Sequence, residues 1–159
     1  MSEVFVVMGS DSDWKVMKAA FDLLQEFGIQ VEKRVVSAHR TPELLASFTK
    51  ECENHHTKCI IAGAGGAAHL PGMLASFTHL PIIGVPVKGS SLDGVDSLYS
   101  IVQMPRGVPV ATVGINNATN AALLALRILA TQNQDLTLKL KEYRETQFKA
   151  SLEKTKNLI

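Results

Sequence analysis

The residues of this chain best suited to chemistry are His39 and Arg40, which lie side by side in the segment 37–42. The segment follows an apolar run, Val31–Val36, that predicts a buried strand, and it ends in a Thr-Pro pair typical of a helix start. Ligands of open α/β sheets bind at turns of this kind. Histidine can transfer protons near neutral pH, and arginine can hold a phosphate or carboxylate through two parallel hydrogen bonds. The segment therefore predicts an anion site with a proton-transfer group beside it.

A second predicted strand end carries serine and aspartate. The segment 9–13, Gly-Ser-Asp-Ser-Asp, follows the first apolar run, and Ser12 or Asp13 is suited to cap the next helix. Free backbone N–H groups at a helix start also favour an anion. Plain capping and anion binding therefore both remain open for this turn.

A third predicted strand end is rich in glycine and contains His69. Gly63, Gly65 and Ala68 fit the loose dinucleotide pattern G-x-G-x-x-G/A, but the next strand ends without an acidic residue to bind a ribose. The small residues suit either close packing of a helix on the sheet or approach of the backbone to a flat ring. In the second case His69 faces the same cleft, and in the first it is a structural histidine.

Alternating apolar runs and helical patterns predict the fold class. The runs are Val4–Met8, Val31–Val36, Cys59–Ala62, Ile82–Val87 and Val110–Val113. The helical patterns cover about 13–27, 42–54, a short stretch after residue 71, part of 92–102 and about 117–131. Runs rich in Val and Ile that barely alternate are typical of parallel strands buried on both faces. We therefore expect an α/β three-layer sandwich with a parallel five-stranded sheet.

The chain divides into two predicted parts. Residues 1–133 form one α/β domain, as expected for a chain of 159 residues. Residues 134–159 are charged and helical in pattern, and apolar residues such as Leu140 and Phe148 recur in them. Because such an apolar stripe has to be covered, this C-terminal helical tail packs either on its own subunit or on a neighbouring one.

Charge, cysteine content and hydropathy exclude several classes of protein. Sixteen basic and fifteen acidic residues leave a net charge of +1 without a basic block, which argues against nucleic acid or a membrane as partner. Cys52 and Cys59 match no zinc or redox spacing and are expected in the core. Asp11 and Asp13 alone suggest a metal, and no further carboxylates stand at strand ends. With no signal-peptide pattern and no apolar run near ~20 residues, we expect a cytoplasmic protein.

Four segments together resemble the 5-(carboxyamino)imidazole ribonucleotide mutase family. They are residues 8–14, 37–42, 62–73 and 97–105, and the resemblance runs from about Val4 to Thr131. It implies a flavodoxin-like subunit, a homo-octamer and the sixth step of de novo purine synthesis. In that step a carboxylate moves from the exocyclic nitrogen of the imidazole to ring carbon four, without ATP, a metal or another cofactor. The animal-type relative has His-Lys-Gly-Pro where this chain has His39-Arg40-Thr41-Pro42, which favours the mutase class.

The resemblance also implies roles for individual residues. His39 resembles the catalytic acid/base, and Ser10, Asp13 and Arg40 resemble substrate-binding residues. The residue types fit these roles, because Arg40 suits the ribose phosphate and Asp13 can accept from ribose hydroxyls. Further substrate contacts are expected from the residues Ser12, Ser37, Gly65 and His69, with the Gly65 loop against the imidazole and His69 helping to hold a carboxylate.

Two other functions remain as alternatives. A flavodoxin-type electron carrier would hold its FMN phosphate in the turn 9–13, but it would not need His39. A noncatalytic ribotide-binding module would bind an aminoimidazole ribotide without converting it. The colour of the purified protein tests the first alternative, and turnover tests the second.

Overall fold

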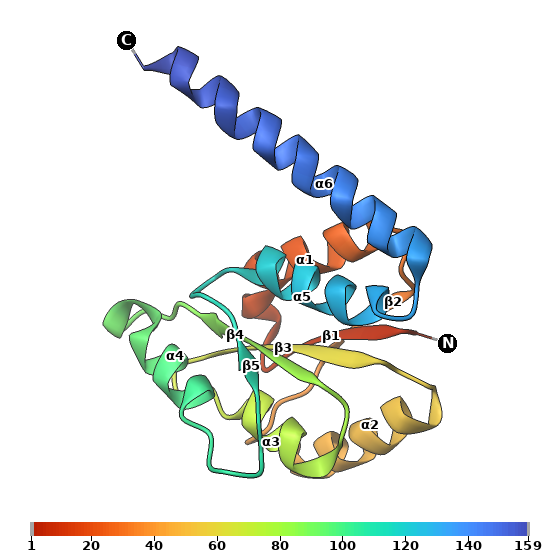
Figure 1. The fold of residues 1–159 in the computed structure, drawn as a ribbon. Coiled ribbons are helices and arrows are strands. Elements are labelled where there is room, and N and C mark those ends of the chain that lie inside the picture. The colour runs from red at the N-terminus through yellow and green to blue at the C-terminus, as the bar shows by residue number, and fades with distance from the viewer. Residues whose placement is uncertain (1, 159) are drawn as a thin grey trace. The chain divides into compact units, whose positions relative to one another are not determined.

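A five-stranded parallel sheet forms the centre of the computed structural model, which describes residues 2–158 (Figure 1). The strands are β1 (Val4–Met8), β2 (Val31–Val35), β3 (Cys59–Gly65), β4 (Ile82–Val87) and β5 (Ala111–Thr112). Their spatial order is β2-β1-β3-β4-β5, which is the flavodoxin-like doubly wound order. The predicted fold class is therefore confirmed.

Helices cover both faces of the sheet, as the alternating pattern predicted. They are α1 (Trp14–Glu26), α2 (Pro42–Asn54), α3 (Leu70–Phe77), α4 (Val95–Val102), α5 (Ala118–Ala130) and α6 (Gln134–Glu153), with the short 3-10 turns η1 (Asp11–Asp13), η2 (Leu92–Gly94) and η3 (Lys154–Asn157). In Figure 1, α1 and the first part of α5 lie on one face, and α2, α3 and α4 lie on the other. The helix after β1 and the helix after β2 thus lie on opposite faces of the sheet. The loops that lead into these two helices therefore diverge at the carboxyl ends of the strands.

The core lies on the central strands. All five residues of β1 and all six of β4 are buried, as expected for parallel strands covered on both faces. Phe5 of β1 packs edge-to-face on Phe48 of α2, with ring centroids 5.1 Å apart. Cys52 and Cys59 are fully buried as predicted, and burial raises the pKa of each thiol to about 12. Both cysteines therefore act as small apolar residues of the core.

The prediction that 31–36 is a buried strand was wrong for most of its length. β2 is an edge strand that pairs only with β1, and Glu32, Lys33 and Val35 in it are exposed. Its Arg34 forms an ion pair with Glu51 of α2, with 2.6 Å between nitrogen and oxygen. The three charged residues in the middle of the run fit an edge position, and Val36, one residue beyond the strand, is buried.

Strand β3 is longer than predicted. It continues through Gly63 and Ala64 to Gly65, where a turn was expected, because β4 pairs with it along this whole stretch. At the other edge β5 comprises only residues 111–112, so the predicted run Val110–Val113 is shorter in the structure. The glycine-rich segment therefore begins as sheet and becomes a loop only after Gly65.

The chain splits into two compact units, residues 1–125 and residues 126–159. The second unit contains the end of α5, the helix α6 and the turn η3. A helix over the tail was predicted, and α6 supplies it. The subunit on which this helix packs stays a prediction. Within residues 2–158, none of the helices combines the length and apolar character that crossing a membrane requires.

Gly84 of β4 is required by the close approach of α4. A methyl group at Gly84 would overlap Cγ2 of Ile101 and lie 3.0 Å from Cγ1 of Val110. Because Ile101 is fully buried and branched at Cβ, it has little freedom to move away. We expect Gly84→Ala to lower the free energy of unfolding by about 1–3 kcal/mol. Urea unfolding measures this loss, with Gly89→Ala as control because nothing lies within 4 Å of a methyl there. Equal midpoints for the two variants would contradict the packing argument.

Candidate active site

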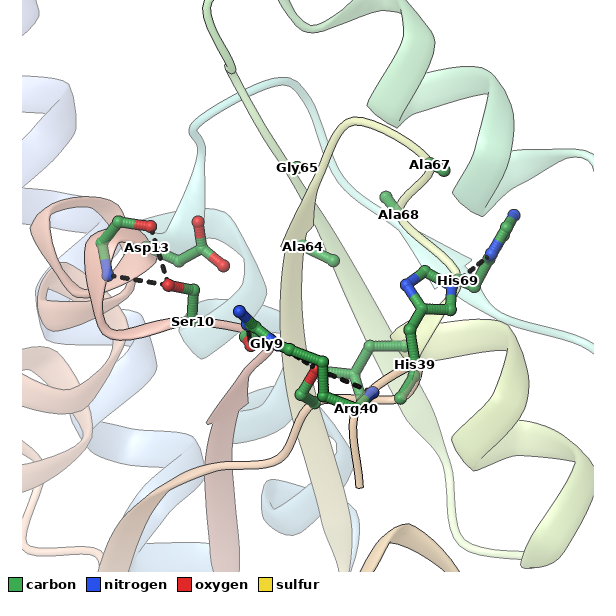
Figure 2. A pocket seen from close by; sticks show the side chains of 14 residues that line it. Gly9, Ser10, Asp13, His39, Arg40, Ala64, Gly65, Ala67, Ala68 and His69 are labelled. Atoms are coloured by element: carbon green, nitrogen blue, oxygen red, sulfur yellow. Dashed lines mark hydrogen bonds between the residues drawn. The ribbon is translucent and has the colours of Figure 1, made fainter. Parts of the chain in front are cut away.

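The turns after β1, β2 and β3 surround one pocket of about 430 Å³ (Figure 2). All eight residues that the sequence singled out line it, namely Ser10, Ser12, Asp13, Ser37, His39, Arg40, Gly65 and His69. The remaining lining residues are small or apolar. A pocket of this volume suits a small organic molecule. The structure thus brings the predicted residues together, and their individual roles stay predictions.

The pairing of β1 with both neighbours positions these turns. Met8, the last residue of β1, is in register with Val35 of β2 and with Gly63 of β3. One step further, the Gly9 N–H donates to the Gly63 carbonyl at 3.3 Å, and the Val36 N–H donates to the Met8 carbonyl at 2.9 Å. Three carboxyl ends of strands therefore lie at the same height. The chain after β1 turns to one face of the sheet and the chains after β2 and β3 to the other, which opens the pocket between them.

Ser10, rather than Ser12 or Asp13, caps the first helical turn after β1. Its hydroxyl oxygen accepts from the Ser12 N–H at 3.4 Å and from the Ser12 hydroxyl at 3.1 Å. The predicted capping hydrogen bond is made by a different residue because a 3-10 turn, η1, precedes α1 and moves the bond three positions earlier. Asp13 stands at the N-cap position of α1 without a capping bond from its side chain. Its carboxylate is therefore available to the pocket.

The Asp13 carboxyl is partly withdrawn from water. Burial raises its pKa above the usual range, the backbone N–H of Ser10 lowers it, and the charge of Asp11 raises it again. Burial is the largest of these effects. An acceptor held in such a place favours a ligand that brings its own hydroxyl donors, because these restore the hydrogen bonds that water would supply.

Arg40 is held across the pocket by two neighbours. The Ser37 hydroxyl oxygen accepts from the Arg40 backbone N–H at 3.3 Å and from Nε at 3.0 Å, and the Gly9 carbonyl accepts from Nη2 at 3.2 Å. Within residues 2–158, Nη1 of Arg40 has no partner. The guanidinium is thus fixed in place with donors left for an anion. Ser37, predicted as a donor to a ligand, accepts from Arg40 in the structure.

The turn that carries His39 is closed by Thr41. Its backbone N–H and its hydroxyl both donate to the Ser37 carbonyl, at 2.8 and 2.9 Å. Thr41 occupies the N-cap position of α2, as predicted, with Pro42 following it. Its hydroxyl closes this turn instead of capping the helix. The closed turn presents His39 toward the loop that follows β3 (Figure 2).

His39 and His69 form a hydrogen-bonded pair. Nε2 of His39 lies 2.7 Å from Nδ1 of His69, and the ring planes meet at 89°. His69 precedes α3 at its N-cap position. Sequence reasoning placed both histidines at one sheet edge but could not pair them. The contact between the Gly9 carbonyl and Arg40 was not predicted from the sequence. The one sign of it there is that a glycine, whose backbone a neighbour can approach closely, stands directly after the first apolar run.

The pocket combines a fixed cation, a partly buried carboxylate and two imidazoles. Among residues 2–158, no three His, Cys, Asp or Glu side chains gather closely enough to hold a metal ion. The cation can bind an anionic group, the carboxylate can accept from hydroxyls, and an imidazole can move a proton. The fold and the pocket together define a flavodoxin-like α/β protein with a polar pocket at the carboxyl ends of three strands.

Comparison with known proteins identifies the family. Residues 3–150 match the family AIR carboxylase, and the chain belongs to that family. The N5-carboxyaminoimidazole ribonucleotide mutase of Thermotoga maritima is 58% identical over 158 residues, which cover 99% of this chain and 92% of the relative. The phosphoribosylaminoimidazole carboxylase of Saccharomyces cerevisiae is 60% identical over 140 residues, 88% of this chain but 24% of that longer protein.

A solved structure supports the same assignment. The crystal structure of Treponema denticola PurE superposes with a TM-score of 0.89 at 33% sequence identity. The match covers 98% of this chain and 97% of that chain. The similarity therefore extends over the sheet, the helices that flank it and the C-terminal helix.

The ionised carboxylate of Asp13 should lower the free energy of unfolding at neutral pH. Because burial raises its pKa in the folded protein, the folded state binds this proton more tightly than the unfolded state does. This loss of stability is complete at a pH above the pKa of Asp13 in the folded protein. It disappears at a pH below the pKa of aspartate in the unfolded chain, about 3.9. We expect Asp13→Asn to raise the Tm at pH 7 and to lose this advantage below about pH 3.5.

Thermal unfolding across this pH range measures the effect. The matched control is Glu142→Gln, which removes an exposed carboxylate on α6. A Tm for Asp13→Asn at or below the wild-type value at pH 7 would contradict the desolvation of Asp13.

Proposed function

We propose that this protein is an N5-carboxyaminoimidazole ribonucleotide mutase of purine biosynthesis. The enzyme is an isomerase that converts 5-(carboxyamino)imidazole ribonucleotide into 4-carboxy-5-aminoimidazole ribonucleotide. The observation that carries the proposal is the pocket itself, in which His39, Arg40 and Asp13 line one cavity at the ends of three strands. The Thermotoga maritima mutase, 58% identical over nearly the whole chain, supports this choice of reaction.

The charges of the pocket suggest how the ribonucleotide binds. Arg40, fixed by Ser37 and Gly9, binds the ribose phosphate together with the hydroxyl groups of the β1 turn. Asp13 accepts from the ribose hydroxyls. The loop that begins at Gly65 lies against the imidazole ring, because its small residues allow the ring to approach the backbone. This arrangement directs the reacting atoms toward the two histidines.

His39 serves as the acid and the base of the reaction. The substrate carbamate loses carbon dioxide, and His39 donates a proton to the exocyclic nitrogen that is left. Ring carbon four then attacks the carbon dioxide held in the pocket, and His39 removes the proton from that carbon. The carboxylate is present in the substrate from the start, so the exchange needs neither ATP nor a metal. Keeping the two fragments together supplies the main rate advantage, about 7–11 kcal/mol for well-oriented reactants.

One assay tests the proposed reaction directly. The purified protein is incubated with the carbamate ribonucleotide, and formation of the 4-carboxylate is followed in the ultraviolet. Turnover above the uncatalysed rate is expected, and its absence would overturn the proposed function. Binding without turnover would favour the noncatalytic ribotide-binding module, and a yellow protein with bound FMN would favour the electron carrier.

His39→Asn should abolish turnover while the fold and ribonucleotide binding persist. Asparagine is similar in size and forms hydrogen bonds, but it carries no proton near neutral pH. We expect kcat to fall at least about 10²–10⁴-fold, together with loss of hydrogen exchange from solvent at carbon four. The control is His55→Asn, an exposed histidine at the end of α2. A folded His39→Asn enzyme within tenfold of wild type (about 1.4 kcal/mol) would assign the acid–base role elsewhere.

Arg40→Lys should weaken ribonucleotide binding although the charge is kept. Lysine lacks the planar fork that binds a phosphate through two nitrogens and cannot reproduce the contacts to Ser37 and Gly9. A charge-assisted hydrogen bond is worth about 1.5–3 kcal/mol, so we expect the Kd to rise about 10- to 100-fold. This Kd is measured by titrating the protein with the ribonucleotide and following the fluorescence of Trp14, which is next to Asp13 in the sequence. Arg144→Lys on α6 should bind normally, and a normal Kd for Arg40→Lys would exclude Arg40 as the phosphate ligand.

The working form is proposed to be a cytoplasmic homo-oligomer, with an octamer expected and active sites near subunit boundaries. Exposed apolar side chains support self-association. Leu92, Val95, Tyr99 and Val102 follow one another at intervals of three and four residues along η2 and α4, and all four are exposed. The tail helix α6 likewise exposes Phe148 and Leu152. Association of subunits through these faces buries the apolar side chains that a single subunit leaves exposed.

Light scattering of the purified protein tests the assembly. We expect a mass several times the 17.2 kDa of one chain, about eightfold for the octamer. Tyr99→Glu, which introduces a charge into the apolar stripe of α4, should reduce the mass, whereas Lys50→Glu at an exposed position of α2 serves as the charge control. A wild-type monomer at working concentration would contradict the proposal.

A further inference from the structure

His39 and His69 form a pair in which one ring must donate and the other must accept. Nε2 of His39 and Nδ1 of His69 are 2.7 Å apart, which is a hydrogen-bond distance, and a single hydrogen lies between them. A neutral imidazole has one N–H and one lone pair. The bond therefore links the tautomer of His39 to that of His69, so neither ring can change its tautomer alone without losing the bond.

The backbone holds both rings in this arrangement. Each histidine follows an alanine that is almost completely buried, Ala38 at 6% exposure and Ala68 at 2%. The turn around His39 is closed by the Thr41 N–H on the Ser37 carbonyl, and the His69 carbonyl accepts from the Met73 N–H in α3. Although both imidazoles face solvent, the segments that carry them are fixed. The 2.7 Å contact is thus a feature of the fold.

The intrinsic preference of imidazole gives the direction of the hydrogen bond. A neutral histidine favours the form with hydrogen on Nε2, and both rings have this form only if His39 donates and His69 accepts. In that state Nδ1 of His39 keeps its lone pair, and within residues 2–158 that atom has no hydrogen-bond partner. Nδ1 is then the atom of His39 that is open to a ligand.

We propose that His69 is a positioning residue that accepts from Nε2–H of His39 and thereby keeps Nδ1 of His39 as the proton-transferring atom. This rests on the proposed function. For the first step Nδ1 takes a proton from solvent, which makes His39 cationic, and gives this proton to the exocyclic nitrogen. Nδ1, again with a lone pair, later takes the proton released when the C4–H bond breaks. The hydrogen on Nε2 of His39 stays there throughout, donated to Nδ1 of His69. The acceptor thereby orients the ring of His39 in the way a triad carboxylate orients its histidine.

Two substitutions at His69 separate positioning from direct participation. His69→Ala removes the acceptor, and we expect kcat to fall about 10- to 100-fold with little change in KM. His69→Asn keeps an amide oxygen near the place of Nδ1 but cannot carry a proton, and we expect it to restore kcat to within about fivefold of wild type. His79→Asn, an exposed histidine outside the pocket, is the control. Wild-type kcat in His69→Ala, or an Asn variant as slow as the Ala variant, would overturn the proposal.

A spectroscopic readout without substrate keeps this test independent of the proposed function. Nitrogen-15 correlation spectra of the histidine rings report which nitrogen carries the hydrogen. We expect His39 in the Nε2–H form in the wild type and in His69→Asn, and a mixture of tautomers in His69→Ala. An Nδ1–H form of His39 in the wild type, or unchanged spectra in His69→Ala, would contradict the proposal. If the wild type lacks mutase activity but shows the expected spectra, the proposed function fails while the histidine pairing stands.

Discussion

The parallel pairing of β1 with both β2 and β3 is the constraint on which the site depends. It places Met8, Val35 and Gly63 in register, so the chain leaves three neighbouring strands at the same edge. The hydrogen bond from Gly9 to Gly63 continues this alignment one residue beyond β1. A shift of one residue would turn each side chain to the other face. Asp13, the neighbours His39 and Arg40, and His69 come from three separate turns, and this alignment brings them around one pocket.

Much of the fold and the membership of the site could be predicted from sequence, because both depend on residue type and order. Apolar runs separated by helical patterns give a parallel sheet, and polar or glycine-rich strand ends indicate the pocket. The environment of 31–36 was predicted wrongly because charged residues at 32–34 occur within the run and mark an edge strand. The contacts of Ser37 with Arg40 and of His39 with His69 were beyond prediction, since they depend on side-chain direction across turns.

Two charged residues of the pocket, Asp13 and Arg40, are placed in a way that suits ligand binding rather than stability of the fold. Asp13 keeps a carboxylate partly away from water without a capping bond, and the raised pKa shows the cost. Arg40 gives some of its donors to Ser37 and Gly9, which fixes its direction before any ligand arrives. Pre-organisation of this kind lowers the entropy lost on binding. A rigid sheet edge therefore supports polar groups that would be poorly placed on a mobile loop.

The central claim is that the carboxylate moves within the pocket from nitrogen to carbon four. The most direct measurement uses substrate with carbon-13 in the carbamate carboxyl group, excess unlabelled bicarbonate and detection of the product by carbon-13 NMR during the first turnovers. If both fragments stay bound between Arg40 and the histidine pair, the label should appear in the 4-carboxylate with little dilution. Product carrying mainly unlabelled carboxyl carbon would show that carbon dioxide escapes to solvent, and that result would contradict the account.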